Sequence, residues 1–344
     1  GPSISSPILA FMPNYDDSLS VGAASFALTD RKPIALVNDN NGKMFDFHQK
    51  FKSVIVADPG LYRDELSELS VSGDPLDSGA IGAVFTTDVL STVIQSAQGI
   101  GNNGILDVNG QYSARPAITS FGEFLKVAAA TYLDIDPSEL RVGQQRIMLE
   151  ECVTEHLFMA DALENGAGYA RRLYDEDRLV QLLAAHYDSV RSTWESEAHA
   201  DCDLSCPDCL RSYGNRMVHH LLDWRLALDV VELVLGKPLN EARWLGNGME
   251  VADWFRRLCQ SSELSVTTEL AGELPAVVHG EDSVLILCHP LWHSRDGLAS
   301  DKQVDAKFEL QSKYGQGIHC TYVDIRKLKI RPQQFILQLG QNGD

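Results

Sequence analysis

Three of the seven cysteines lie close together in the chain, in the order Cys202-x3-Cys206-x2-Cys209. A short turn can bring thiolates at these separations to one ion, and three thiolates with one imidazole form a common tetrahedral shell for Zn²⁺. The spacing therefore predicts a metal site, and zinc is the ion that suits these donors best.

The fourth donor of such a shell has to come from outside the three cysteines. We expect His219, because it enters at the start of the following helix; His220, His199 and Cys152 are the alternatives. A shell of four protein ligands is closed and leaves no position for water or a substrate. The sequence thus predicts Zn²⁺ as a structural cofactor and assigns no catalytic residue to this site.

Two other interpretations of the thiols stay open. Cys206-Pro-Asp-Cys209 is a C-x-x-C sequence, and a thiol at a helix start can be reactive enough for a redox couple. Such a couple needs only two sulfurs, so Cys202 argues against it. Packing of the three side chains in a turn without a metal is the other alternative.

Regular elements have to hold this turn in place. Strands are expected in KSVIVAD (52–58) and in EHLFMAD (155–161), and a hairpin is expected at Asn41-Gly42, because both residues tolerate a positive φ. The segment AVFTTDVLSTVI (83–94) reads as a strand that runs into a helix. The first part of the chain therefore looks like a mixed sheet.

Helices are expected to dominate the middle of the chain. One should follow the capping pattern Ser120-Phe-Gly-Glu123, one should start at Asp136-Pro137, and a long one should cover about 169–187. The segment after the cysteines, HLLDWRLALDVVELVLGKP, predicts a further helix that ends at Gly236. These helices would flank the cysteine turn on both sides.

The last hundred residues alternate between helix and strand. A helix is expected in EVADWFRRLC, and strands are expected in AVVHG, SVLILCH, IHCTYVDI and QFILQL. The predicted fold class is α/β of the mixed α+β kind. We expect an N-terminal mixed sheet (1–119), a central helical region with the zinc-bearing turn (120–236) and a smaller C-terminal α/β lobe (237–344).

Composition restricts the class of protein. The chain has 344 residues, of which 44% are hydrophobic and 22% are charged, as in an ordinary globular protein. No apolar run approaches the ~18 residues that a membrane span needs, so no membrane partner is expected. An odd number of cysteines without a disulfide framework favours the reducing cytoplasm.

The net charge of −19 limits how the chain can bind nucleic acid. Phosphate contacts require a basic patch. The candidate residues are Arg211, Tyr213 and Arg216 beside the cysteines, and residues 325–332 (IRKLKIRP) form a second basic stretch. Solvated surface charge is the alternative for both groups.

Two further patterns have weaker chemical meaning. Asn165, Gly166 and Gly168 lie between an expected strand and a helix, where backbone amides can hold an anion, although glycines at such a turn also serve tight packing. Asp282 followed by Asp305-x-Lys307 is similar to the acid and acid-x-Lys pattern of metal-dependent nucleases, a short match that often arises by chance.

Three segments together resemble one known family: CDLSCPDCLRSYGN, the downstream H-x-x-LDWRLALD and the upstream FMADALENGAGYA. The family is the zinc-binding domain, formerly of unknown function, that follows the motor in a group of DEAD/DEAH-box superfamily 2 helicases. DNA-repair helicases carry it, as do helicases and partner subunits of anti-phage systems such as DISARM and Druantia. The resemblance covers about residues 38–236.

The resemblance also bears on the metal ligands. In the repair branch the pattern is C-x3-C-x2-C-x5-C, and the fourth cysteine of that pattern falls on Asn215 here, which is a poor zinc ligand. The form LRSYGN-x3-H looks like a second branch of the family, in which His219 takes the place of that cysteine.

The resemblance implies an accessory domain that engages DNA together with a helicase motor or another defence subunit. The chain begins with Gly1-Pro2-Ser3, so we expect it to be a piece of a larger protein. It has no G-x-x-x-x-G-K-[ST] sequence and no Asp-Glu-Ala-Asp or Asp-Glu-Ala-His box. We therefore expect no ATP hydrolysis by this chain alone. A protein-interaction scaffold without nucleic-acid contact is the alternative, and a nuclease is a weaker one.

Overall fold

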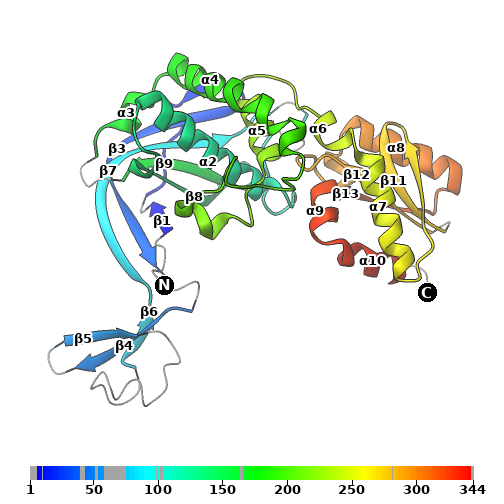
Figure 1. The fold of residues 1–344 in the computed structure, drawn as a ribbon, viewed down its shortest axis with the longest axis horizontal. Coiled ribbons are helices and arrows are strands. Elements are labelled where there is room, and N and C mark those ends of the chain that lie inside the picture. The colour runs from blue at the N-terminus through cyan, green and yellow to red at the C-terminus, as the bar shows by residue number, and fades with distance from the viewer. Residues whose placement is uncertain are drawn as a thin grey trace.

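The computed structural model describes residues 6–9, 11–38, 43–50, 53–57, 75–97, 99–100, 104–162, 166–280 and 282–341. The chain forms a larger first unit, a C-terminal lobe beside it, and a small sheet at the end of a long two-stranded arm (Figure 1). The mixed α/β class expected from the sequence is confirmed. None of the described helices is long and apolar enough to cross a bilayer.

The first unit is built on a six-stranded antiparallel sheet in the order β1-β3-β7-β9-β8, with β2 paired to β3. Its strands are β1 (Ser6–Leu9), β2 (Leu19–Val21), β3 (Ala24–Asn38), β7 (Ile81–Ile94), β8 (Leu140–Leu149) and β9 (Cys152–Asp161). The strand expected in EHLFMAD is confirmed as β9. The segment 83–94 is a single strand instead of a strand running into a helix.

The arm consists of the distal halves of β3 and β7, which stay paired beyond an irregularity between Thr29 and Lys32. It carries a three-stranded sheet of β5 (Ser53–Ala57), β4 (Phe45–Lys50) and β6 (Asp77–Gly79). The strand expected in KSVIVAD is confirmed as β5. Asn41-Gly42 lies outside the described residues, and β3 and β4 are not paired with each other.

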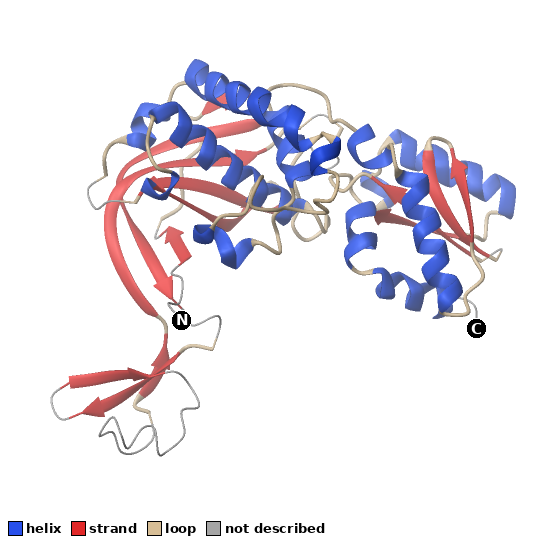
Figure 2. Ribbon diagram, viewed as in Figure 1, coloured by secondary structure: helices blue, strands red, loops and turns tan. Residues whose placement is uncertain are grey.

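Among the described residues, four helices belong to the first unit, and Figure 2 shows them beside its long strands. They are α2 (Ala114–Leu133), α3 (Tyr169–Leu173), α4 (Glu176–Trp194) and α5 (Trp224–Val234). The helix expected over 169–187 is interrupted before Asp175, whose side chain caps α4 by accepting a hydrogen bond from the backbone N–H of Arg178. At 136–139 there is only a short 3-10 turn, η1 (Pro137–Glu139), although the capping box is present.

Helix α2 begins at Ala114, so the predicted start at Ser120 is wrong. Ser120 and Glu123 are buried within the helix instead of capping it. The Ser120 hydroxyl accepts a hydrogen bond from the N–H of Asp223, and Glu123 accepts one from the Asn215 side chain. A domain boundary at residue 119 would therefore cut through α2 and through the β7–β9 pairing that crosses it.

The turn between β2 and β3 meets the end of α5 directly. The N–H of Ala23, at the turn between β2 and β3, donates to the carbonyl of Leu233 at the end of α5 over 3.1 Å. Gly22 has a φ of +50°, and a Cβ there would lie 2.2 Å from the Val234 carbonyl oxygen. Only glycine allows this close approach. Helix α5 ends as expected, with Gly236 at a φ of +71°.

The C-terminal lobe has a four-stranded sheet in the order β10-β11-β12-β13, in which only the β12–β13 pair is parallel. Its strands are β10 (Thr267–Ala271), β11 (Leu274–His279), β12 (Ser283–Cys288) and β13 (His319–Asp324). Its helices are α6 (Ala242–Leu245), α7 (Gly248–Ser261), α8 (Asp301–Tyr314), α9 (Ile325–Ile330) and α10 (Pro332–Gln341). The segment QFILQL is helical, because Phe335 and Leu339 face the core four residues apart.

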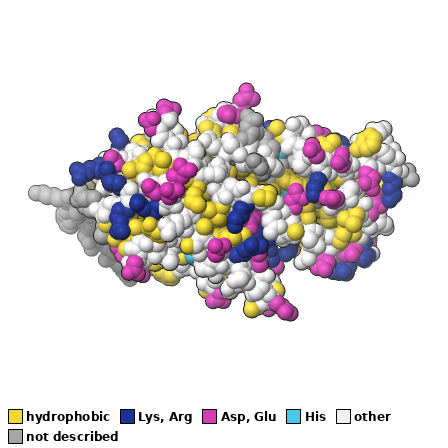
Figure 3. Space-filling model, turned by 90° about the horizontal axis from the view of Figure 1, so that it is seen from above, with side chains coloured by type: hydrophobic (Ala, Val, Ile, Leu, Met, Phe, Trp, Pro, Cys, Tyr) yellow, Lys and Arg dark blue, Asp and Glu magenta, His cyan; other side chains and the backbone are white. Residues whose placement is uncertain are grey.

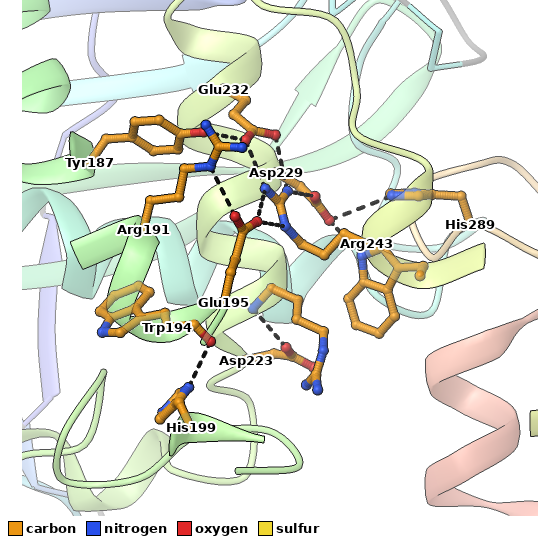
Figure 4. A network of polar contacts seen from close by, with 12 residues as sticks. Tyr187, Arg191, Trp194, Glu195, His199, Asp223, Asp229, Glu232, Arg243 and His289 are labelled. Carbon is orange, nitrogen blue, oxygen red and sulfur yellow. Dashed lines mark hydrogen bonds and ion pairs between the residues drawn. The ribbon is translucent and has the colours of Figure 1, made fainter. Parts of the chain in front are cut away.

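Buried polar pairs join the lobe to the first unit. The Arg326 guanidinium donates to Asp223 over 2.8 Å, and the Ser113 hydroxyl donates to Asp324 over 2.6 Å. The Nε2 atom of His289 lies 3.5 Å from the Asp229 carboxylate (Figure 4). The contact between the two units is thus fixed by several specific polar groups.

Candidate metal centre

Four donor atoms converge in the loop that follows α4. The ligand atoms of His199, Cys202, Cys206 and Cys209 all lie within 4.8 Å of one another. The Sγ of Cys209 is 4.0 Å from that of Cys202 and 3.7 Å from that of Cys206, and the His199 Nε2 is 3.3 Å from the Cys206 Sγ. Tetrahedral zinc with Zn–S bonds of about 2.3 Å places its sulfurs roughly 3.8 Å apart. The separations fit that shell.

His199 is oriented as a metal-binding histidine should be. Its Nδ1 lies 3.0 Å from the carbonyl oxygen of Trp194, and its ring packs edge-on against Trp224 with the centroids 5.4 Å apart. A carbonyl oxygen only accepts, so Nδ1 carries the proton and Nε2 presents its lone pair to the sulfurs. Metal-ligating histidines usually have this second hydrogen bond, which fixes the tautomer.

Backbone hydrogen bonds shape the cysteine turn. The N–H of Cys206 donates to the Sγ of Cys209 over 3.1 Å, and the N–H of Arg211 donates to the carbonyl of Cys206 over 3.0 Å. The indole N–H of Trp224 donates to the carbonyl of Cys202 over 3.2 Å. Helix α5, which begins at Trp224, therefore anchors the loop that carries the donors.

The thiols of the turn have raised pKa values. Burial raises the pKa of Cys209 to about 11, with a further contribution from Cys206. Burial also raises the pKa of Cys202, and the neighbouring Cys209 adds to that effect. Without a cation, three adjacent thiolates would repel one another in a partly buried site. A bound divalent ion would reverse this balance and favour the thiolates.

The expected fourth donor, His219, is not part of the cluster. Its Nε2 lies 3.0 Å from the Ser212 carbonyl oxygen and 2.9 Å from the Asn215 Oδ1, because the 3-10 turn η3 (Tyr213–Val218) directs it there. Among the described residues, His220 and Cys152 are not in the cluster either. The structure brings His199 to the sulfurs instead. The spacing His199-x2-Cys202 was a signal in the sequence that could have identified it.

Asn215 holds the turn against the rest of the unit. Its amide group donates to Glu123 of α2 and to the Leu210 carbonyl, each over 2.8 Å, and its Oδ1 accepts from the N–H of Ser212. The residue that aligns with the fourth cysteine of the repair branch is therefore a buried hydrogen-bonding residue in this protein.

The three residues expected to contact nucleic acid lie on or next to this turn. Tyr213 is 75% exposed, and the Arg216 guanidinium lies over its ring, 4.5 Å from the centroid. The Arg211 Nε donates to the Ser205 hydroxyl over 2.9 Å. A hollow of about 510 Å³ adjoins the turn, and Arg211, Lys126 and Arg141 are among its lining residues. Two acids, Glu123 and Asp136, line the same recess, and Glu123 pairs with Lys126, so Arg211 and Arg141 are the cations left over.

The face shown in Figure 3 carries side chains of both charges. There, Lys and Arg side chains occur in small separate groups among acidic and apolar ones. This distribution agrees with the net charge of −19. Contact with a phosphate backbone would therefore be local on that face.

The candidate anion site is already occupied by a carboxylate of the protein. The buried Asp161 accepts hydrogen bonds from the N–H groups of Tyr169 and Ala170, at the start of α3, over 3.1 and 3.3 Å. A Cβ on Gly166 would lie 2.9 Å from that carboxylate, which indicates a packing role, and Gly168 directly precedes the helix. Asn165 lies outside the described residues.

The residues of the nuclease alternative do not form a site. Asp305 and Lys307 lie on helix α8 and not on a strand, so side chains two positions apart point in different directions. The Lys307 ammonium pairs with Asp296 over 2.8 Å, and Asp282 lies at a turn before β12. The acid-x-Lys pattern is therefore a chance match.

These features define a class of protein: a domain with a Cys3His cluster in a loop between helices, packed beside an antiparallel sheet. Residues 121–210 match the family model of the MrfA Zn-binding domain. The expected resemblance to the zinc-binding domain of helicase-related proteins is thereby confirmed.

A curated protein is also similar to part of this chain. The chain is 29% identical to the Druantia protein DruE of Escherichia coli (strain UMEA 4076-1) over 163 residues, which is 45% of this chain and 8% of that protein. The chain thus matches less than a tenth of the length of this relative.

Two solved structures also match. One is a crystal structure of the DUF1998 helicase MrfA bound to DNA, with a TM-score of 0.37 and 13% identity over 64% of this chain and 25% of that one. The other is the same helicase bound to DNA and AMPPNP, with a TM-score of 0.23 and 12% identity over 56% of this chain and 22% of that one.

Proposed function

We propose that this chain is a non-catalytic accessory part of a helicase or of a helicase-partner subunit. It holds a structural zinc ion and contributes to DNA engagement in repair or anti-phage defence. The observation that carries the proposal is the set of four donors at tetrahedral separations. All four lie within residues 121–210, the segment that matches the zinc-binding family. Zinc would be held by Cys202, Cys206, Cys209 and His199.

A structural role for the ion follows from its surroundings. Four protein donors close the shell, so no position remains for a water molecule or a substrate. The donors lie on a loop between the end of α4 and the start of α5, and Trp194 and Trp224 support that loop from the two helices. The ion would fix the loop relative to both helices and keep the adjoining turn rigid.

DNA engagement is supported by the residues on that rigid turn. Guanidinium groups suit phosphate, and an exposed aromatic ring can stack on an unpaired base. Arg211, Arg216 and Tyr213 supply these groups. Two or three phosphate contacts give a shallow salt dependence and weak binding by themselves. The chain would therefore act within a larger assembly, whose helicase motor or other defence subunit supplies further contacts and ATP-driven movement.

The test combines metal analysis with DNA binding. Elemental analysis of the purified chain should find about one zinc per chain, and its absence from protein prepared without chelator would refute the zinc part of the proposal. In the assembled complex, Arg211→Ala with Arg216→Ala should lower DNA affinity and reduce the salt slope by about 2, one unit for each lost phosphate contact. Arg256→Ala with Arg257→Ala, on α7 of the C-terminal lobe, is the matched two-charge control.

The alternative is a protein-interaction scaffold without nucleic-acid contact, which the net charge of −19 favours. If the double arginine variant leaves DNA affinity unchanged at every salt concentration but loses association with the partner subunit, the scaffold is correct. Co-sedimentation of the assembled complex measures the second quantity.

A further inference from the structure

A cavity of about 470 Å³ lies between the C-terminal lobe and the first unit. It is lined by residues at the carboxyl ends of the parallel strands β12 and β13, by residues 108–112 of the first unit, and by one side of α10. In α/β sheets, ligands commonly bind outside the carboxyl ends of parallel strands. The volume is also in the usual range for a small-molecule site.

Lys327 lines this cavity, and Arg331 lies next to it against the Tyr112 ring without being part of the lining. The Lys327 ammonium lies 5.6 Å from the ring centroid of Tyr112 and 5.5 Å from that of Phe335, and the Arg331 guanidinium lies 5.3 Å from the Tyr112 centroid. Within the described part of the chain, neither forms an ion pair. Their neighbours Arg326 and Lys329, in contrast, pair with Asp223 and Asp203.

The buried end of the cavity offers an acceptor. The Asp324 carboxylate accepts hydrogen bonds from the Ser113 hydroxyl and from the N–H groups of Arg326 and Lys327. Three donors hold the two oxygens in place, and each carboxylate oxygen can accept two hydrogen bonds, so acceptor capacity remains. Burial raises the pKa of this carboxyl to about 6, which leaves it mostly ionised at neutral pH.

A histidine beside the cavity is held in one tautomer. The His293 Nδ1 accepts from the N–H of Arg295 over 3.1 Å, so its Nε2 carries the proton. That buried Nε2–H points toward Asp107, 3.6 Å away, and makes no hydrogen bond of ordinary length to the described residues. A Cβ on Gly110 would lie 2.3 Å from the same Nε2. The side of the cavity formed by Gly110 and His293 is therefore tightly packed and polar.

We propose that this cavity binds a phosphorylated nucleoside, with its phosphate at Lys327 and Arg331 and its base extending toward Asp324. The two cations fit a phosphate, because nothing else in the described chain neutralises them. The partly exposed Tyr112 ring provides apolar surface for a planar base, and an amino group on that base can donate to the Asp324 carboxylate. The site is separate from the cysteine cluster and does not depend on the zinc or DNA proposals.

Calorimetric titration and thermal melting of the full chain test this site, with AMP, adenosine and inorganic phosphate as ligands. AMP should bind more tightly than adenosine or phosphate alone and should raise the melting temperature, because a ligand that binds only the folded state stabilises it. Lys327→Gln should weaken AMP binding at least tenfold. Arg331→Gln, at an exposed position where folding is not at risk, should also weaken it.

Lys329→Gln is the matched control, because Lys329 lies on the same helix, α9, but is directed away from the Tyr112 ring and pairs with Asp203 instead. No AMP binding at millimolar concentration by the folded wild-type chain would overturn the proposal. Equal losses in the Lys327 and Lys329 variants would overturn it as well, since they would indicate unspecific charge attraction. A 5′-phosphorylated tetranucleotide distinguishes the two possible sources of the bound nucleotide. If it competes with AMP, the site accepts the end of a strand. If only AMP binds, the site accepts a free nucleotide.

Discussion

A buried polar cluster around Arg243 and the partly buried cysteine cluster differ in the origin of their cation. In the Arg243 cluster, a buried guanidinium contacts Asp229, Glu232 and Glu195, so the chain itself supplies the positive charge (Figure 4). In the cysteine cluster, four donors face one another and no cationic side chain lies among them. The first cluster contains a cation of its own, and the second needs one from solution.

The surroundings of the two clusters agree with this difference. The Tyr187 hydroxyl and the Trp244 indole N–H donate to the carboxylates around Arg243, over 2.5 and 2.7 Å, so the remaining lone pairs there are satisfied. In the cysteine turn, the supporting hydrogen bonds fix the loop and the tautomer of His199 but bring no charge. A cluster of metal-type donors that contains no cationic side chain therefore indicates a ligand that the sequence does not encode.

Removal of a cysteine ligand should have the largest effect. Cys206→Ser should abolish zinc binding and lower the free energy of unfolding substantially, since zinc binding contributes on the order of 10 kcal/mol in small zinc domains. Elemental analysis and denaturant unfolding measure the two effects. Cys320→Ser, at a half-buried position on β13 outside the cluster, is the control and should retain the metal. Equal zinc content in both variants would contradict the assignment.

The choice of the fourth ligand is tested by two histidine variants. His199→Ala should weaken zinc retention at least tenfold in competition with a chelator, because it removes a direct ligand. His219→Ala should keep the metal and lose only the hydrogen bonds to Ser212 and Asn215. The reverse result would restore His219 as the ligand.

Removal of the internal cation should destabilise the protein without releasing zinc. Arg243→Met leaves buried carboxylates unpaired, which costs about 3–5 kcal/mol of unfolding free energy. Adding Asp229→Asn should recover part of this loss, because one of the unpaired charges is then absent. If Arg243→Met also lowers zinc content, the two clusters are not independent.

A smaller effect on stability is expected from pH, through His289, which lies against Asp229 of the Arg243 cluster. Burial, with a contribution from Arg243, lowers the pKa of His289 from 6.5 to about 3. The unfolded chain therefore binds a proton between these values that the folded chain does not. Its contribution to stability is fully present above pH 6.5 and is lost as the pH falls, by about 1.4 kcal/mol per pH unit within the window.

The histidine contribution can be isolated by comparison with a variant. His289→Gln should show a weaker loss of stability between pH 6.5 and 4 than the wild-type chain, with denaturant unfolding as the measurement. Protonation of the cysteine ligands affects both proteins alike, so the difference between them reports on His289. Parallel stability curves would show that His289 is not responsible.

The sequence revealed local chemistry better than long-range contacts. The spacing of the three cysteines and the cap at Gly236 depend on neighbouring residues, and both were predicted. The start of α2 was misplaced at Ser120, although Pro116, in the first turn after Ala114, was a usable signal. His199 was passed over although it is only three residues before Cys202, because the expected helix start at His219 was given more weight than this spacing.

The missed features depend on parts of the chain that are distant in sequence. The long strand β7 is stabilised by pairing with β3 and β9, which overrides its helical appearance near residue 90. The Arg243 cluster joins α4, α5 and α6 and has no motif. The cavity between the units likewise arises only when β12, β13 and residues 108–112 meet.

The hydrogen bond between Ala23 and Leu233 has a consequence for biosynthesis. The turn between β2 and β3 can be fixed by this bond only after α5 has left the ribosome, more than two hundred residues later. The packing of Gly22 also depends on α5, because the Gly22 backbone lies against the end of that helix. Such non-local contacts slow folding and leave early strands exposed during synthesis. The nascent chain should therefore stay protease-sensitive until α5 has emerged, and zinc can complete its site only shortly before that point.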